Sequence, residues 1–279
     1  MEATTVTSLT LDDCLIPTWE VSPRVRALVT TRRGGVSRAP YDRLNLGLHT
    51  GDERALVLAN RRALSELAGG PRFAWLEQVH GNEVVDAAAV VGQLDAQDAP
   101  PRADASVTDQ VGIACIVMVA DCMPVLFCDE RGRAVGAAHA GWRGLASGVL
   151  ERTAAALARK AGAGARIHAY LGPSIGPNAF EVGRDVFDAF VEAASVSERD
   201  ATVHAFKPHT EGKYMADLPA LARLRLTRAD VVAMTGGEHC TVSEPARFFS
   251  FRRDRTTGRF AAAVWLGENE FESSGARAT

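Results

Sequence analysis

Short runs of hydrophobic residues recur along the chain, separated by polar and glycine-containing segments. Such runs, bounded by turn-forming residues, are typical of β-strands. The pattern predicts strands at Val25–Thr30, Phe73–Val79, Ala105–Thr108, Ile113–Ala120, Val125–Cys128, Ala134–Ala138, Ile167–Leu171, Val231–Thr235 and Phe260–Leu266.

A second pattern, with apolar residues three or four positions apart, predicts helices. It is clearest between Asp52 and Leu67 and returns at Leu145–Ala161, Arg184–Ala194 and Asp217–Leu226. Asp217 followed by Pro219 is a typical helix start. The strands and helices do not alternate strictly, and the strands on either side of "DERGR" have hairpin spacing. We therefore predict an α+β fold with mixed β-sheets covered by helices.

Composition excludes several classes of protein. The formal net charge of −3 is unsuited to general nucleic-acid binding. Five cysteines without a CxxC pair argue against a disulfide framework and favour a reducing compartment. The start of the chain lacks the pattern of a signal peptide, and the longest apolar run, Val111–Ala120, is too short to span a bilayer. We expect a cytoplasmic protein that binds neither nucleic acid nor membrane.

Three residues with metal-binding or catalytic side chains follow predicted strands: His80, Cys122 and His139. Two imidazoles and a thiolate would suit zinc, with a fourth position free for water or substrate. The same residues could instead form a cysteine nucleophile with a histidine base. A third interpretation is a buried structural cysteine near two hydrogen-bonded histidines, and spacing alone does not separate these alternatives. Cys115 and Cys128 lie inside apolar runs, which indicates packing.

Candidate substrate contacts lie in glycine-containing loops. Arg143 in "GWRG" precedes a predicted helix and would suit an anion such as phosphate. Arg32 in "TTRRGG" has the same interpretation, with a surface arginine as the alternative for both. Asn45 in "LNLG" is a further candidate ligand, although asparagine is common in turns.

Several motifs together resemble the YfiH family, whose members have been described as laccase-domain or polyphenol oxidase-like proteins and as purine nucleoside phosphorylases. The resemblance extends from Val25 to Leu266 and rests on the segments "TTRRGGVSRAPYDRLNLGLHTGD", "WLEQVHG", "ADCMPVLF", "HAGWRG", "LGPSIGPNAFEVG" and "FFSFRRDRTTGRFAAAVWL". Many relatives carry a cysteine after the "GPSIG" segment, where this chain has Pro177, Asn178 and Ala179.

The resemblance implies a YfiH-like, cysteine hydrolase-like fold and a zinc site formed by His80, Cys122 and His139, which would also be the catalytic residues. It implies phosphorolysis of adenosine, inosine and 5′-methylthioadenosine to the base and a ribose 1-phosphate, together with deamination of adenosine. The expected partners are purine nucleosides and phosphate, and the expected assembly is a monomer or homodimer. We expect an N-terminal extension over residues 1–24, one catalytic domain over 25–267 and a disordered tail over 268–279.

Two other functions use the same three residues. A laccase-like polyphenol oxidase would bind copper there, but the seven histidines include none of the HxH pairs usual in multicopper oxidases. A cysteine–histidine hydrolase that edits peptidoglycan precursors would need no metal. Metal content and sensitivity to chelators separate this hydrolase from the zinc enzyme.

Overall fold

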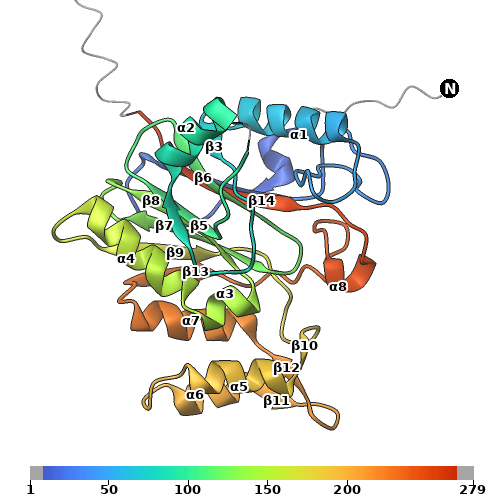
Figure 1. The fold of residues 1–279 in the computed structure, drawn as a ribbon, viewed down its shortest axis with the longest axis vertical. Helices are drawn as coiled ribbons and strands as arrows, with labels where there is room; N and C mark the ends of the chain where they lie inside the picture. The colour runs from blue at the N-terminus through green and yellow to red at the C-terminus, as the bar shows by residue number, and fades with distance from the viewer. Residues whose placement is uncertain (1–8, 98, 269–279) are drawn as a thin grey trace, which may run out of the picture.

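The computed structural model describes residues 9–97 and 99–268, which form two large β-sheets, a small sheet and flanking helices (Figure 1). The first sheet has the order β1–β2–β14–β6–β3, with strands Cys14–Leu15, Val25–Thr30, Phe260–Leu266, Ile113–Val119 and Arg72–Ala74. The second has the order β13–β9–β7–β8–β5–β4, with strands Ala233–Gly236, Ile167–Leu171, Met123–Asp129, Val135–Ala140, Ala105–Thr108 and Val84–Asp86.

Both sheets are mixed, as predicted. Most neighbouring strands are antiparallel, including the hairpin of β7 and β8. The pairs β3–β6, β4–β5 and β13–β9 are parallel. The α+β fold class expected from the sequence is therefore confirmed.

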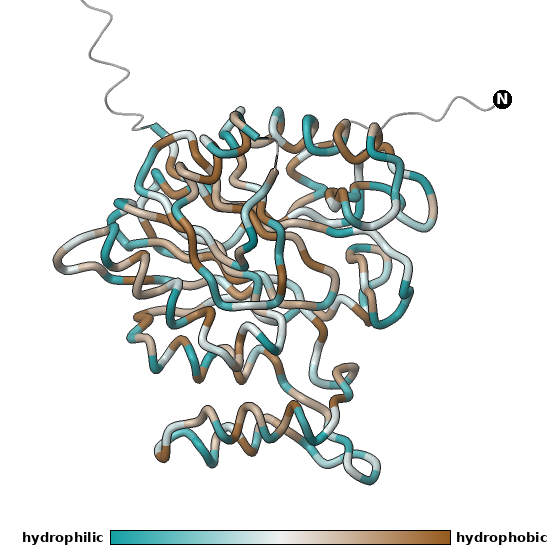
Figure 2. The backbone as a smooth tube through the Cα atoms, in the orientation of Figure 1, coloured by the Kyte–Doolittle hydropathy of each residue, from teal (hydrophilic) through white to brown (hydrophobic). Residues whose placement is uncertain are grey.

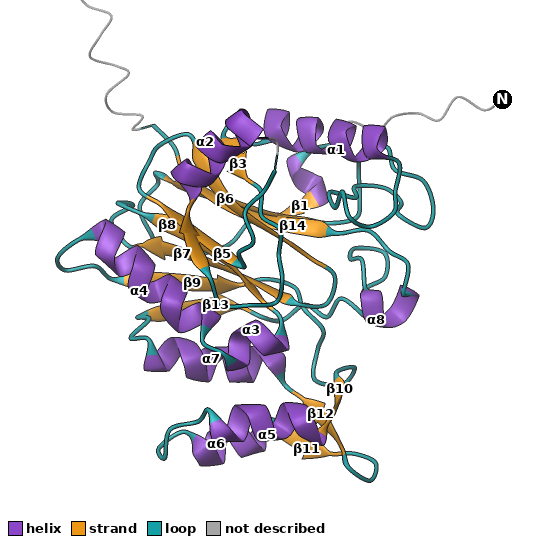
Figure 3. Cartoon of the chain, in the orientation of Figure 1, coloured by secondary structure: helices purple, strands orange, loops and turns teal. Residues whose placement is uncertain are grey.

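The two sheets pack face to face and are covered by helices on their outer faces (Figures 1 and 3). The helices are α1 (Arg54–Leu67), α2 (Ala87–Gln97), α3 (Trp142–Ala146), α4 (Val149–Ala161), α5 (Arg184–Glu192), α6 (Arg199–His204), α7 (Leu218–Arg228) and α8 (Phe251–Asp254), with a 3-10 turn at Leu11–Asp13. Helix α1 lies on the outer side of the first sheet, and α4 and α7 lie on the outer side of the second. Strands of both sheets contribute to the central core, and these strands are largely hydrophobic in Figure 2.

Residues 181–216 form a small layer of their own at the bottom of Figure 1. It contains α5, α6 and a three-stranded sheet of order β10–β12–β11, with strands Glu181–Gly183, Lys213–Ala216 and Phe206–Pro208. This segment adds no strand to either large sheet. It packs on the α3 and α7 side of the molecule through side chains such as Val186 and Phe190.

Some element boundaries differ from the sequence predictions. The strand expected at Phe73–Val79 ends at Ala74. The helix expected at Leu145–Ala161 is two helices, α3 and α4, because Gly148 between them has a left-handed φ of 90°. The start of α7 agrees with the prediction, since the Asp217 carboxylate accepts a hydrogen bond from the Ala220 N–H.

The N-terminal segment expected to be an extension contributes β1, which pairs with β2. The disordered tail expected at residues 268–279 lies, except for Glu268, outside the described residues. Among the helices of the described part of the chain, none has the length and apolar character needed to cross a bilayer.

Candidate active site

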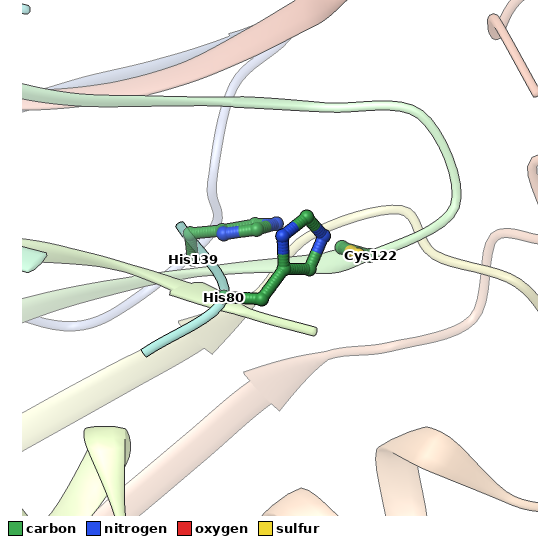
Figure 4. Close-up of side chains that lie close together, drawn as sticks. All are labelled: His80, Cys122 and His139. Carbon is green, nitrogen blue, oxygen red and sulfur yellow. The ribbon is translucent and has the colours of Figure 1, made fainter. Parts of the chain in front are cut away.

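His80, Cys122 and His139 come together from three separate segments (Figure 4). His80 lies in the loop after β3, Cys122 directly precedes β7, and His139 lies within β8. One ligand atom from each residue lies within 4.8 Å of the other two. Because β7 and β8 are paired, with Pro124 opposite His139, the hairpin itself brings Cys122 close to His139.

Asp104 holds two of these three residues in place. Its Oδ1 lies 2.8 Å from Nδ1 of the buried His139, so Nε2 is the ring atom left for the cluster. The same carboxylate accepts hydrogen bonds from the backbone N–H groups of Val79, His80 and Gly81, at 3.2, 2.9 and 2.7 Å. The loop that carries His80 is therefore tied to the residue that orients His139.

The cluster strongly changes the acidity of its own groups. Burial alone would raise the pKa of the Cys122 thiol, but the charges and hydrogen bonds of His139 and His80 outweigh it and lower that pKa to about 6. Burial would lower the pKa of His139, but the Cys122 thiolate and the Asp104 carboxylate raise it to about 9. At neutral pH the site therefore holds a thiolate, the form of cysteine that acts as a ligand or nucleophile.

The backbone around the cluster adopts conformations that are unusual for side-chain-bearing residues. His80 and Asp121 have φ values of 60° and 90°, and both lie in or beside the cluster. Gly141 leaves room for it, because a Cβ there would come within 2.9 Å of the His80 ring and 3.0 Å of the Cys122 sulfur. Strained backbone of this kind is enriched at functional sites.

The donor set fits a metal ion. Two imidazole nitrogens and one thiolate are ligands that zinc prefers, and the carboxylate behind His139 is the usual outer partner of a metal-binding histidine. In the described residues, this is the one group of His, Cys, Asp or Glu side chains close enough together to hold an ion. Cys122 is partly buried and His80 is exposed, which leaves one side of the cluster open.

The open side faces a cavity of about 670 Å³. Its lining combines aromatic and cationic side chains with the three clustered residues, and includes Trp142, Phe180, Phe251, Arg143, Arg252 and Arg259. Cavities of this size with a few polar groups on an apolar wall are typical of small-molecule sites.

Asp121 connects the cluster to one wall of this cavity. Its carboxylate accepts hydrogen bonds from the Thr241 hydroxyl and from the backbone N–H of Arg252, both at 2.6 Å. Arg252 lies in the first turn of α8, beside Phe251, whose side chain is 48% exposed. The residue next to Cys122 thus fixes the helix that presents an aromatic ring to the cavity.

The three other predicted contacts have different positions. Arg143 lies in α3 and lines the cavity, with its guanidinium carbon 4.3 Å from the centre of the Trp142 ring. Arg32 does not line the cavity: its Nη2 lies 3.4 Å from the Asp42 carboxylate, and its Nε donates to the Asp42 carbonyl.

Asn45 is fully buried and also does not line the cavity. Its side-chain oxygen accepts hydrogen bonds from the backbone N–H groups of Gly47 and Arg259. Because Arg32 and Asn45 are engaged elsewhere, we do not assign them to substrate.

Several residues of the site were not expected from the sequence, namely Asp104, Asp121, Phe251, Arg252 and Arg259. The only local signal for Asp104 is a carboxylate directly before a strand, "ADASVT". Asp121 lies in the "ADCMPVLF" motif, and Phe251, Arg252 and Arg259 lie in the "FFSFRRDRTTGRFAAAVWL" motif, but neither motif indicates a role for these single residues.

Comparison with known proteins shows which family this chain belongs to. Residues 26–267 match the family described as multi-copper polyphenol oxidoreductase laccase. The chain is 51% identical over 254 residues to a purine nucleoside phosphorylase of Pseudomonas aeruginosa, covering 90% of this chain and 98% of that protein. It is 46% identical over 253 residues to the purine nucleoside phosphorylase YfiH of Escherichia coli, with the same coverage. The chain belongs to the YfiH family.

The solved structures agree with this assignment. A Neisseria meningitidis protein with 47% identity superposes with a TM-score of 0.83 over 92% of this chain and all of that one. The YfiH fold is therefore shown by sequence and by structure. The family description and the His–Cys–His cluster together point to metal binding.

Proposed function

We propose that this chain is a zinc-dependent purine nucleoside phosphorylase that acts on adenosine, inosine and 5′-methylthioadenosine and also deaminates adenosine. The observation that carries the proposal is the cluster of His80, Cys122 and His139 at the wall of a nucleoside-sized cavity. The names of the Pseudomonas aeruginosa and Escherichia coli relatives support the phosphorylase activity. The finer points, which are the substrates, the deamination and the zinc, are our proposal.

The cavity offers complementary surfaces for the two parts of a nucleoside. Trp142, Phe180 and Phe251 provide apolar and aromatic contacts suited to a planar base. Arg143 provides a guanidinium for an anionic group. Asp121, through the N–H of Arg252, keeps the Phe251 ring at a fixed place relative to the cluster.

Phosphorolysis exchanges one bond at the ribose for another. A phosphate oxygen forms a bond to C1′ while the C1′–N9 bond breaks and its electron pair leaves on the base. Overall, the proton lost by hydrogen phosphate ends on the base, giving free base and ribose 1-phosphate, or the 5-methylthio derivative. Deamination instead adds water at C6 of adenosine and releases ammonia, giving inosine.

His80, Cys122 and His139 would hold the zinc ion, which would supply a Lewis acid and a nucleophilic water at neutral pH. The protein keeps Cys122 ionised through the two imidazoles and keeps His139 oriented through Asp104. Copper can bind the same ligands and is an alternative occupant. A multicopper oxidase would need further copper ligands, and the described residues offer one such cluster.

The test uses protein of defined metal content and a panel of nucleosides, with and without phosphate, with the products resolved by mass. Omitting phosphate should abolish ribose 1-phosphate formation and leave inosine formation from adenosine. Loss of both products together would contradict two reactions with separate nucleophiles. Absence of both products at full metal loading would contradict the proposed function.

A second candidate function is favoured by one specific observation. Cys122, His139 and Asp104 are arranged as thiolate, imidazole and orienting carboxylate, as in cysteine hydrolases. Such an enzyme would cleave an amide, for example in a peptidoglycan precursor, without a metal. Full activity after the metal has been stripped would favour this candidate, whereas loss of activity with restoration by zinc would exclude it.

A further inference from the structure

Two arginine side chains beside the active site have no carboxylate partner among the described residues, in contrast to arginines such as Arg32 and Arg133. Arg259 lines the cavity, and its Nη1 donates to the carbonyls of Thr257 and Gly258 at 3.1 and 3.0 Å. Arg61, in α1, donates from Nε to the Leu46 carbonyl at 2.9 Å. In the parts of the chain that the structure describes, neither guanidinium has a carboxylate within ion-pair distance.

Both side chains are held in place by uncharged groups. The guanidinium carbon of Arg61 lies 3.7 Å from the centre of the Trp75 ring, and its Nη2 lies 3.7 Å from the Met118 sulfur. Burial, followed by the charge of Arg54, lowers the pKa of Arg61 to about 10. Burial also lowers the pKa of Arg259. Partly buried cations that are fixed but not neutralised are favourable partners for an anion.

His49 links the two arginines to each other and to the cluster. Burial lowers the pKa of His49, and the positive charges of Arg259, Arg61 and His139 lower it further, so all three lie within electrostatic range of this ring. His49 and Met118 line both the active-site cavity and a neighbouring cavity of about 730 Å³, which Arg61 also lines. His49 therefore lies where the two cavities meet, with Arg259 on the wall of the active-site cavity and Arg61 on the wall of its neighbour.

The loop that contains Asn45 and Gly47 holds Arg259 in place. Asn45 accepts a hydrogen bond from the backbone N–H of Arg259 at 2.9 Å and from that of Gly47 at 3.0 Å. A Cβ on Gly47 would come within 2.8 Å of the Thr50 methyl group and 2.9 Å of Cγ of Arg259, so glycine leaves room for the Arg259 side chain. Asn45 thereby positions Arg259 and does not need to touch a ligand itself.

The negative groups nearby are already engaged. The Cys122 thiolate and the Asp121 carboxylate both act electrostatically on Arg259. Cys122 is the proposed zinc ligand, and Asp121 accepts hydrogen bonds from the Thr241 hydroxyl and the Arg252 backbone N–H. Glu77, which lines both cavities, lies 3.7 Å from Arg102. Neither carboxylate forms an ion pair with Arg61 or Arg259.

We propose that His49, Arg61 and Arg259 form an oxyanion subsite that holds inorganic phosphate beside the metal-ligand cluster. That this phosphate is the attacking one rests on the proposed phosphorolysis; the binding of phosphate itself does not. Arg143 is exposed and stacks on Trp142, so solvent screens its charge, and it is a secondary contact.

The test is a calorimetric titration of inorganic phosphate into the full-length, zinc-loaded protein at fixed pH and ionic strength. Arg259→Gln and Arg61→Gln should each raise the Kd for phosphate about ten- to a hundredfold, the size expected for loss of a charge-assisted contact. Arg32→Gln is the matched control, because Arg32 pairs with Asp42 outside the cavity, and it should leave the Kd unchanged.

Melting temperature and zinc content of each variant show whether it is folded. If Arg259→Gln does not fold, Arg61→Gln, which lies on a different element, decides the question. Wild-type Kd values in folded, zinc-loaded variants would overturn the subsite, as would the absence of phosphate binding to the wild type at millimolar concentrations. Phosphate binding that depends on both arginines, in a protein that forms no ribose 1-phosphate, would support the subsite and contradict the proposed function.

Discussion

The two ends of strand β7 carry the same two residue types in mirrored order, with Asp121 and Cys122 before the strand and Cys128 and Asp129 at its end. At the first end, two imidazoles lower the pKa of the Cys122 thiol to about 6. At the second end, burial and the neighbouring Asp129 carboxylate raise the pKa of the Cys128 thiol well above its ordinary value. One strand thus carries a reactive thiolate at one end and an inert thiol at the other.

The carboxylates differ in the same way. Asp129 is fully buried and binds the Arg133 guanidinium with both oxygens, at 2.7 and 2.8 Å, so it closes the turn to β8. Asp121 has a left-handed φ and bonds to Thr241 and to the N–H of Arg252, which connects the cluster with α8. The neighbours that the fold brings to each Cys–Asp pair, and not the pair itself, therefore decide whether its role is chemical or structural.

The largest difference should be between the effects of Cys122→Ala and Cys128→Ala on zinc content and activity. Cys122→Ala removes the anionic ligand, so we expect loss of most bound zinc and nearly all activity, whereas Cys128→Ala should keep both. His80→Ala and His139→Ala should resemble Cys122→Ala. Elemental analysis beside turnover measures the difference, and Cys115→Ala is a second buried control. One equivalent of zinc retained by Cys122→Ala would show that the Cys122 thiolate is not a zinc ligand.

The second effect concerns the carboxylate behind His139. Asp104→Asn keeps the shape but weakens the bonds to His139 and to the His80 loop, so zinc affinity should fall about ten- to a hundredfold. Asp129→Asn should instead lower the free energy of unfolding by about 1–3 kcal/mol, because Arg133 loses its buried partner, and should leave zinc affinity unchanged. Competition with a chelator and urea unfolding separate the two outcomes. Equal zinc loss in both variants would show that Asp104 acts only through stability.

A third effect follows from the sign of the thiol pKa. The folded-state pKa of Cys122 lies below its ordinary value, so the thiolate is present at neutral pH and is lost as the pH falls through about 6. Protons then compete with zinc, and zinc occupancy should decline below that pH. Metal content after equilibration across a pH series measures this, with Cys128→Ala expected to follow the wild-type profile. Occupancy that already declines as the pH falls below about 9 would contradict the lowered pKa.

The smallest effect should be that of the inert thiol on stability. Cys128→Ala removes a fully buried sulfur from the core between the sheets, so it should lower the free energy of unfolding by about 1 kcal/mol. Chemical denaturation of the zinc-loaded wild type and variant measures the change. No change in stability together with a loss of zinc would mean that the two ends of β7 are not independent.

Much of this arrangement could be predicted from the sequence, because the strands on either side of the cluster are long apolar runs. The hairpin of β7 and β8 follows from such runs separated by a short polar turn. The predicted strand Phe73–Val79 was too long, because the N–H of Val79 bonds to the Asp104 carboxylate instead of a neighbouring strand. Helix α2 was missed because it is short and rich in alanine and valine, without a clear polar face.

The structure brings His80, Cys122 and His139 together, and the expectation that they form one site depended on the resemblance to the YfiH family as much as on the residues. The residues that surround and orient these three could not be predicted from the sequence. Asp104, Asp121 and Arg259 reach the site from distant segments, and a single carboxylate or guanidinium has no local pattern that distinguishes it from a surface charge. Arg32 had a local pattern, an arginine in a glycine-rich loop, but its guanidinium contacts Asp42 and does not line the cavity.

The small layer formed by residues 181–216 has a consequence for how this architecture can diversify. The chain enters it from Phe180 and returns through Leu218, and both of these residues line the cavity. The layer supplies no strand to the large sheets and no member of the metal-ligand cluster. Residues 181–216 do not themselves line the cavity, so insertions, deletions or grafts between these two points would leave His80, Cys122 and His139 in place and would act on the cavity only through the positions of Phe180 and Leu218.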